Sequence, residues 1–293
     1  MAPNSFFGAG ELNPNMTKEA IEQLKAVYGL DKSLFGQYVD WVANISKLNF
    51  GISFVSGQDV SGEIFKRLPV TLSMNLVSMF FVFVLCIYLG IKSALNYEKK
   101  SDYIIRQLSL VSFSMPSFYL ALLFIIVFSL KLGLFPIAGL HSIEPKTGLA
   151  NYTDMAWHLV LPIGVMIFVG LGSMIIYIRS LTLEILKSDY YYFALSRDIS
   201  KKNLLRYYIL PNLLPPIITL LGLSLPSLIG GSVILESIFG IDGMGQLFFA
   251  SALSRDYPVI MGILMITAFL TLFGNMVADL ILLKLNPYMK RGL

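Results

Sequence analysis

The chain has 293 residues, of which 56% are hydrophobic and only 14% are charged. Soluble domains carry about 25% charged residues, so this composition indicates a protein surrounded largely by lipid. A single cysteine, Cys86, excludes an internal disulfide framework, and two histidines leave little for metal or acid–base chemistry. We therefore expect an all-α, polytopic membrane protein with no catalytic, cofactor or metal site.

Charge-free stretches long enough to cross a bilayer recur along the chain. About 20 helical residues span the hydrocarbon core, whereas a barrel strand needs only about 10 and alternates polar with apolar residues. The length and uniformity of the windows therefore favour helices. Five transmembrane helices are predicted, at Val70–Ile91, Gln107–Leu130, Met155–Ile178, Tyr207–Leu235 and Tyr257–Ala278.

Basic residues are unevenly distributed over the connections between these windows. The connection 92–106 carries four basic and two acidic residues, and the connection 179–206 carries six basic and three acidic residues. The connections 131–154 and 236–256 have no basic excess. Because loops rich in Lys and Arg remain in the cytoplasm, we expect both basic connections and the C-terminus inside. The net charge of +4 then fits contact with anionic lipid, and no nucleic-acid partner is expected.

The first 69 residues present a difficulty for this orientation. They should form an external segment, 1–69, ahead of a transmembrane domain, 70–293, yet no apolar window precedes them. Residues Met1–Leu12 lack the basic start and the sustained apolar stretch of a signal peptide. We hypothesise that a first transmembrane helix is missing from this sequence. The alternative is a tail that is translocated without a signal.

The connection 179–206 has the pattern of a helix, a turn and a second helix. Apolar residues recur at helical spacing from Leu181 to Tyr190, the sequence Asp198-Ile199-Ser200 interrupts them, and the pattern resumes at Leu204. Ser200 suits the N-cap of the second piece. Basic side chains surround this turn at Arg197, Lys201 and Lys202. From pattern alone, docking into a groove of a cytoplasmic partner and lying on anionic lipid are equally supported.

The window Tyr207–Leu235 is unusually rich in proline and glycine. Gly222, Pro226 and Gly230 recur every four residues on one helix face, and Gly231 follows. Small residues allow helices to approach closely, and backbone breaks at membrane depth are tolerated only against protein or a water-filled cavity. We expect this helix to line a translocation path at the centre of an assembly. The alternative is that its prolines serve packing alone.

The connection 236–256 contains three glycines in six residues, Gly240, Gly243 and Gly245. No strand precedes them and no Lys-Ser/Thr pair follows, so a phosphate-binding loop is not indicated. We expect a tight hairpin or re-entrant connection and no ATP site in this chain.

Several motifs together resemble a known family. The run Leu183–Tyr190 with Ala194, Leu210-Pro211-Asn212 and Pro216 is similar to the cytoplasmic EAA-type motif of ABC importer permeases. Further stretches resemble the first, B-type permease subunit of the dipeptide/oligopeptide/nickel subgroup: Gly29–Lys32, Gln37-Tyr38, Gly51–Ser53, Arg67–Pro69, Glu236–Phe239, Gly243–Gly245, Arg255–Val259, Asn275, Asp279 and Asn286-Pro287.

The resemblance implies the type I importer permease fold and a set of partners. These would be a second permease forming a heterodimer, two cytoplasmic ATPase subunits, an external substrate-binding protein and the lipid bilayer of the bacterial inner membrane. It makes 70–293 a permease domain and 179–206 its coupling loop, which docks in an ATPase groove. The coupling residues carried over from the motif are Tyr190, Ala194, Arg197, Asp198, Ile199, Ser200, Lys201, Lys202, Asn212 and Pro216.

The chain departs from the family pattern at three places. Asp198 stands where the family has a glycine, although Asp is among the residues that best tolerate a positive φ. Tyr208 stands where many relatives have His, and the family's first helix with its PGDP-like sequence is not found. The absent helix agrees with the hypothesis drawn from the charge distribution.

The substrate implied by the subgroup is a di- or oligopeptide, with nickel import by the same architecture as the alternative. A secondary transporter without ATPase partners would need ionisable residues in mid-membrane, and the five windows contain no Asp, Glu, Lys or Arg. A structural membrane-assembly subunit would need no coupling loop.

Overall fold

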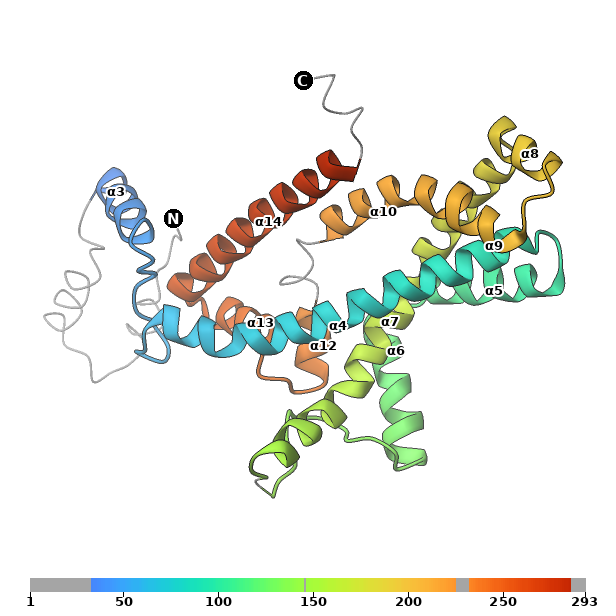
Figure 1. The fold of residues 1–293 in the computed structure, drawn as a ribbon. Coiled ribbons are helices and arrows are strands. Elements are labelled where there is room, and N and C mark those ends of the chain that lie inside the picture. The colour runs from blue at the N-terminus through green and yellow to red at the C-terminus, as the bar shows by residue number, and fades with distance from the viewer. Residues whose placement is uncertain (1–32, 145, 225–231, 286–293) are drawn as a thin grey trace, which may run out of the picture. The chain divides into compact units, whose positions relative to one another are not determined.

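The computed structural model describes residues 33–144, 146–224 and 232–285, and this part of the chain is almost entirely helical (Figure 1). The only β-pairing in these residues is an isolated antiparallel bridge between Ile52 and Asp59. The helices, in chain order, are α3 (Leu34–Ile45), α4 (Val60–Leu95), α5 (Lys100–Ser114), α6 (Ser117–Phe124), η1 (Ile125–Lys131), α7 (Leu149–Leu186), α8 (Asp189–Ser196), α9 (Lys201–Leu204), η2 (Leu205–Ile209), α10 (Leu210–Ser224), α12 (Val233–Ile238), α13 (Met244–Ser254) and α14 (Tyr257–Leu285).

The apolar windows predicted from the sequence correspond to helices of membrane-spanning length. In the described residues, four helical stretches are long and apolar enough to cross a bilayer: Val60–Leu95, Leu149–Leu186, Lys201–Ser224 and Tyr257–Ile281. A fifth span results if α5 and the stretch Ser117–Lys131 are counted together. The all-α, polytopic membrane fold is therefore confirmed, with four spans or up to five.

The window Gln107–Leu130 is not one straight helix. The chain bends by 105° between α5 and the stretch Ser117–Lys131. Met115, the residue before Pro116, has φ −85° and ψ 126°. Because a proline disfavours helical backbone in the residue before it, this extended conformation ends α5 at Ser114. α5 also begins earlier than predicted, at Lys100, so its first two turns precede the apolar window.

The window Tyr207–Leu235 also differs from a single predicted helix. α10 covers its first part and ends at Ser224, and α12 begins at Val233. Residues 225–231 lie outside the described residues, and with them Pro226, Gly230 and Gly231. Pro215 and Pro216 lie within α10. Membrane helices tolerate proline where neighbouring groups form hydrogen bonds with the backbone carbonyls that the proline leaves free.

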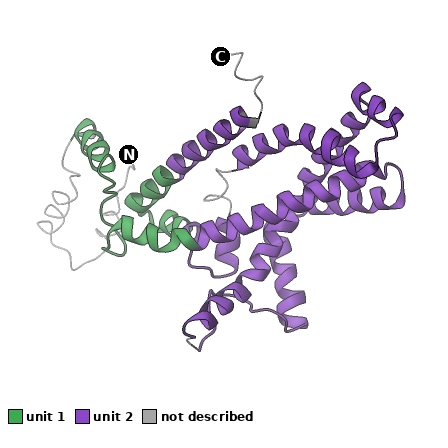
Figure 2. Ribbon diagram, viewed as in Figure 1, with its two compact units in different colours: residues 1–69, 247–266 green, residues 70–246, 267–293 purple. Residues whose placement is uncertain are grey.

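The chain divides into two compact units (Figure 2): residues 1–69 with 247–266, and residues 70–246 with 267–293. In the first unit, Asp256 is almost fully buried and accepts a hydrogen bond from Ser53 Oγ at 2.5 Å. The backbone N–H groups of Phe54 and Val55 donate to the same carboxylate at 3.1 and 3.3 Å. This single carboxylate fixes the loop that contains the Ile52–Asp59 bridge.

In the second unit, α7 packs against both α4 and α5 at glycines. A Cβ at Gly90 of α4 would lie 2.7 Å from Ile178 Cγ2, and one at Gly172 would lie 2.6 Å from the backbone N of Phe113 in α5. Helices in lipid associate without a hydrophobic driving force and depend on close packing. Small residues allow their backbones to approach closely enough for this packing. Ser112 of α5 adds a hydrogen bond to the Phe168 carbonyl of α7.

Candidate functional site

The segment 179–206 begins as a continuation of α7 and not as a loop. α7 runs through Arg179 to Leu186, α8 follows from Asp189, and α9 begins at Lys201. Asp198 lies in the turn between α8 and α9 with φ +55°. This is the left-handed backbone that glycine adopts freely and that Asp tolerates better than most residues. Ser200 occupies the N-cap position of α9 but makes no side-chain capping hydrogen bond.

One face of the segment 179–206 is buried against the membrane helices. Tyr191, Ala194 and Leu204 belong to an apolar cluster that also contains residues of α4, α5, α7, η2 and α10. Burial raises the pKa of Tyr191 above its ordinary value, so this phenol stays neutral. The ends of α4, α5 and α7 meet α8 and α9 at this cluster (Figure 1).

The opposite face of α8 is exposed and aromatic. Tyr190, Tyr192 and Phe193 are 43%, 58% and 59% exposed. The guanidinium of Arg197 lies 4.4 Å from the centre of the Phe193 ring. Lys201 and Lys202 are exposed at the start of α9. This combination of aromatic side chains with arginine is typical of the surfaces that proteins use to bind each other.

Not all of the predicted coupling residues lie together. Tyr190, Ala194, Arg197, Asp198, Ile199, Ser200, Lys201 and Lys202 lie on α8, α9 and the turn between them. Asn212 and Pro216 lie further along, in α10, where the Asn212 side chain donates to the Tyr208 carbonyl at 2.7 Å. Gly222 is buried, and a Cβ there would lie 2.8 Å from Ala278 Cβ.

A buried ion pair lies at the start of the segment 179–206. Arg179 Nε and Nη2 donate to the two carboxylate oxygens of Asp102 at 2.7 and 2.8 Å. The Asp102 side chain is 1% exposed and also accepts from Ser93 Oγ and from the Glu98 N–H. The guanidinium lies 5.4 Å from the centre of the Tyr97 ring. These contacts join α7 to α4, α5 and the turn between them.

A second buried carboxylate, Glu236, organises the connection that follows α12. Its Oε1 accepts from Thr71 Oγ1 at 2.9 Å and from Ser232 Oγ at 2.7 Å, and its Oε2 accepts from the Gln246 N–H at 2.9 Å. The Thr71 hydroxyl in turn accepts from the Met244 N–H at 2.8 Å. The Glu236 carboxylate therefore lies at the N-terminus of α13, where free N–H groups and the helix dipole favour negative charge.

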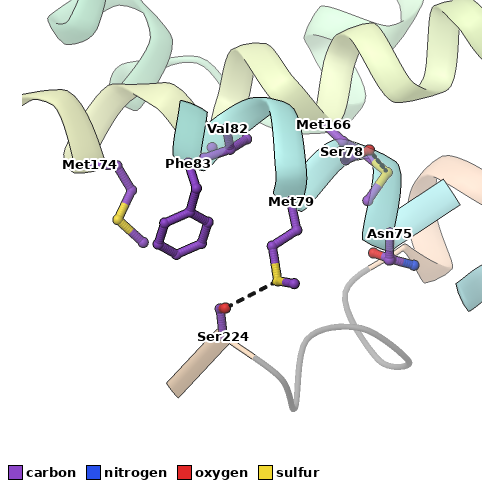
Figure 3. A pocket seen from close by; sticks show the side chains of 9 residues that line it. Asn75, Ser78, Met79, Val82, Phe83, Met166, Met174 and Ser224 are labelled. Atoms are coloured by element: carbon purple, nitrogen blue, oxygen red, sulfur yellow. Dashed lines mark hydrogen bonds between the residues drawn. The ribbon is translucent and has the colours of Figure 1, made fainter. Parts of the chain in front are cut away.

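A cavity of about 210 Å³ lies between α4, α7 and the end of α10. Figure 3 shows the methionine and phenylalanine side chains that make its walls largely apolar. Ser224 donates to Met79 Sδ at 3.4 Å, and Ser78 donates to Met166 Sδ at 3.5 Å. Its lining residues are Asn75, Ser78, Met79, Val82, Phe83, Met166, Gly170, Met174 and Ser224. Among the described residues, no group of three His, Cys, Asp or Glu is arranged to hold a metal ion.

Sequence reasoning did not select Asp102, Arg179 or Glu236 as site residues. For Arg179 and Glu236 a signal is present in their position at the edge of an apolar stretch: Arg179 directly follows the window Met155–Ile178, and Glu236 directly follows Tyr207–Leu235. An ionisable residue at such an edge needs either water or a partner. The partners themselves are distant in sequence, and no local pattern identifies them.

The turn at Asp198 offers a direct test of backbone geometry. Asp198→Gly is expected to keep or slightly increase stability, because glycine adopts φ +55° without strain, whereas Asp198→Val should cost about 1–2 kcal/mol. Thermal unfolding of the purified protein in detergent measures both. A valine variant as stable as the glycine variant would show that this turn does not require left-handed backbone.

The fold and these sites describe a multi-spanning helical membrane protein whose segment 179–206 projects an aromatic and basic surface. The solved structure of the MetNI methionine ABC transporter in an inward-facing conformation contains a chain of similar fold. The TM-score is 0.61 at 16% sequence identity, and the match covers 76% of this chain and 96% of that one.

Residues 86–291 match the family "Binding-protein-dependent transport system inner membrane component", and the chain belongs to this family of membrane permeases. It is 36% identical to the oligopeptide transport system permease protein AppB of Bacillus subtilis, over 94% of this chain and 87% of that protein. It is 32% identical to the di/tripeptide transport system permease protein DppB of Pseudomonas aeruginosa, over 96% and 87%. It is also 32% identical to the metal-staphylopine import system permease protein CntB of Staphylococcus aureus, over 95% and 85%.

The resemblance to B-type permeases of peptide ABC importers, first drawn from motifs, is confirmed by these matches. The chain is therefore a membrane permease of the ABC importer class, and its family is one of transport components and not of enzymes.

Proposed function

We propose that this chain is a transmembrane subunit of an ATP-driven importer and that it forms the path for di- and oligopeptides together with a second permease. Two cytoplasmic ATPases and an external binding protein complete the complex. The observation that carries this proposal is the segment 179–206, whose exposed aromatic and basic face is held rigidly on the ends of the membrane helices. The peptide permeases among its relatives support the substrate class.

In this proposal, the segment 179–206 and the C-terminus face the cytoplasm of a bacterial cell and the chain crosses the inner membrane. α8 and α9 are the coupling elements, with Tyr190, Arg197 and the turn Asp198–Ser200 at the ATPase surface. When the ATPases close on ATP, they displace these elements and change the access of the path between the two permeases.

The path itself is proposed to run beside α4, α7 and α10. The cavity lined by Met79, Met166 and Met174 lies between these helices. Thioether side chains are flexible and polarisable and can repack around different partners, which suits a path for peptides of varied sequence. Gly222 and the undescribed residues Pro226, Gly230 and Gly231 are assigned to helix packing around this path.

Uptake by the reconstituted complex tests the proposal. The chain is co-expressed with its second permease and ATPases, purified on a tag on this chain, and placed in liposomes with the binding protein. We expect two ATPase subunits per complex and ATP-dependent accumulation of labelled dipeptide and oligopeptide. Accumulation of nickel and not of peptide would show that the substrate is the metal. Uptake that needs a proton or sodium gradient and no ATPase would contradict the proposal altogether.

Charge reversal at Lys201 and Lys202 is expected to uncouple this complex. Both side chains are exposed at the start of α9, so their replacement by Glu should leave the fold intact while it places like charge against the docking partner. Peptide uptake should fall about tenfold or more while ATP hydrolysis persists. The matched control is charge reversal at Lys47 and Lys131, two exposed basic residues outside both the segment 179–206 and the α4–α5 turn. Equal uptake by both double variants would show that α9 is not part of the coupling surface.

A further inference from the structure

The Asp102–Arg179 ion pair stands out because it is buried, bidentate and placed where α7 passes into the segment 179–206. The two side chains are 1% and 14% exposed. A bidentate guanidinium–carboxylate pair fixes both the distance and the relative orientation of the groups that carry it. The pair therefore fixes the end of α7 to the α4–α5 turn much more narrowly than apolar contacts alone would.

Other contacts around the pair make this part of the molecule a rigid corner. Ser93 of α4 and the Glu98 N–H both donate to Asp102, and Glu98 has a positive φ of +62°. One turn before Ser93, Gly90 lies so close to α7 that a Cβ there would be 3.1 Å from the Arg179 N. The backbones of α4 and α7 thus touch at the same place where the charges meet.

The segment 179–206 is anchored in the same corner. Ile178 and Ile185, one on each side of Arg179, share an apolar cluster with Tyr191 and Ala194 of α8. The cluster also takes in Ile105, one turn after Asp102 on α5. Packed side chains therefore connect α8 to the part of α7 that carries Arg179, and Arg179 is hydrogen-bonded directly to Asp102 of α5.

We propose that Arg179 and Asp102 are positioning residues that join the segment 179–206 to the α4–α5 corner. Displacement of α8 then moves α4, α5 and α7 as one body and not α7 alone. This inference rests on the proposed function, because it assigns the route by which movement of the coupling elements reaches the membrane helices. Coupling of this kind requires a continuous structural element whose conformational equilibrium is shifted by events at either end.

The test uses the full complex in liposomes and measures peptide transported per ATP hydrolysed, at equal amounts of assembled complex. Arg179→Lys keeps the charge but loses the bidentate geometry, and Asp102→Asn loses the charge. Transport per ATP should fall about threefold and about tenfold respectively, while hydrolysis continues. Asp154→Asn, which breaks the Lys146–Asp154 pair at the other end of α7, is the control and should leave the ratio unchanged. Wild-type ratios in both Arg179→Lys and Asp102→Asn would overturn the inference.

A covalent replacement of the ion pair gives an independent readout. In a Cys86→Ala background, the double variant Asp102→Cys/Arg179→Cys should lose coupling, and a short thiol-specific cross-linker between positions 102 and 179 should restore it. Cross-linking that blocks transport would show that the two positions must separate during the cycle, and the inference would be wrong. Since each variant is compared with an active wild-type complex, failure here is distinct from failure of the importer function.

Discussion

Glu236→Ala is expected to produce the largest loss of stability of any single substitution considered for this chain. The side chain is fully buried, and its two oxygens accept from Thr71, Ser232 and the Gln246 N–H. Each buried donor left without an acceptor costs about 1–3 kcal/mol, and removal of the buried charge offsets part of that loss. The net decrease in the free energy of unfolding should be about 3 kcal/mol.

The measurement is the thermal unfolding midpoint of the detergent-solubilised protein, followed by fluorescence-detected size exclusion. Glu236→Gln retains one acceptor oxygen but places an amide N–H₂ against another donor, so its midpoint should lie between those of alanine and wild type. Ser237→Ala is the matched control, since the Ser237 hydroxyl only donates to the Val233 carbonyl within its own helix. A wild-type midpoint for Glu236→Ala would contradict the assigned network.

Gly172→Ala is expected to have the second largest effect. The new Cβ would lie 2.6 Å from the backbone N and 2.9 Å from the Cα of Phe113. Backbone atoms cannot rotate away as a side-chain end can, so α5 and α7 must separate, and the hydrogen bond from Ser112 to Phe168 weakens with them. The expected loss is about 2–3 kcal/mol.

Gly164→Ala provides an unusually close control for this effect. Gly164 lies on the same helix, and its added Cβ would meet only the ring edge of Phe124 at 3.7 Å. Because alanine favours helix over glycine by about 1 kcal/mol, Gly164→Ala should be neutral or stabilising. Equal unfolding midpoints for the two alanine variants would show that the α5–α7 contact is looser than described.

The membrane-spanning helices could be predicted because apolar length is a local property of the sequence. Prediction from apolar length fails at Pro116, where a window without charges contains a sharp bend. The proline itself was the signal, since it forces Met115 out of helical backbone. Hydropathy averages over such a residue and does not register it.

The buried polar contacts could not be predicted in the same way. Arg179 and Asp102 are separated by 77 residues in sequence, and Thr71 and Glu236 by 165. Their pairing depends on which helices become neighbours, and the spacing of residues along one helix does not contain that information. The glycines after Glu236 show the consequence. Their spacing predicts turn residues, and Gly240 does have a positive φ of +59°.

Gly243 and Gly245 are required for a different reason. A Cβ on either would lie within 3 Å of the Glu236 carboxylate. Their small size therefore makes room for a charge, and the turn itself needs only Gly240. The sequence pattern of an acidic residue followed by two closely spaced glycines can be understood as one unit, in which the glycines let a helix N-terminus close on the carboxylate.

The two faces of α8 are under different structural constraints. Tyr191 and Ala194 are fixed by the interior they share with the membrane helices, whereas Tyr190, Tyr192 and Phe193 contribute little to that interior. On the proposed docking role, the outer face can therefore be exchanged for that of another importer without disturbing the inner one. Recognition of a new ATPase would then evolve, or be engineered, by changes at a few surface positions on an unchanged scaffold.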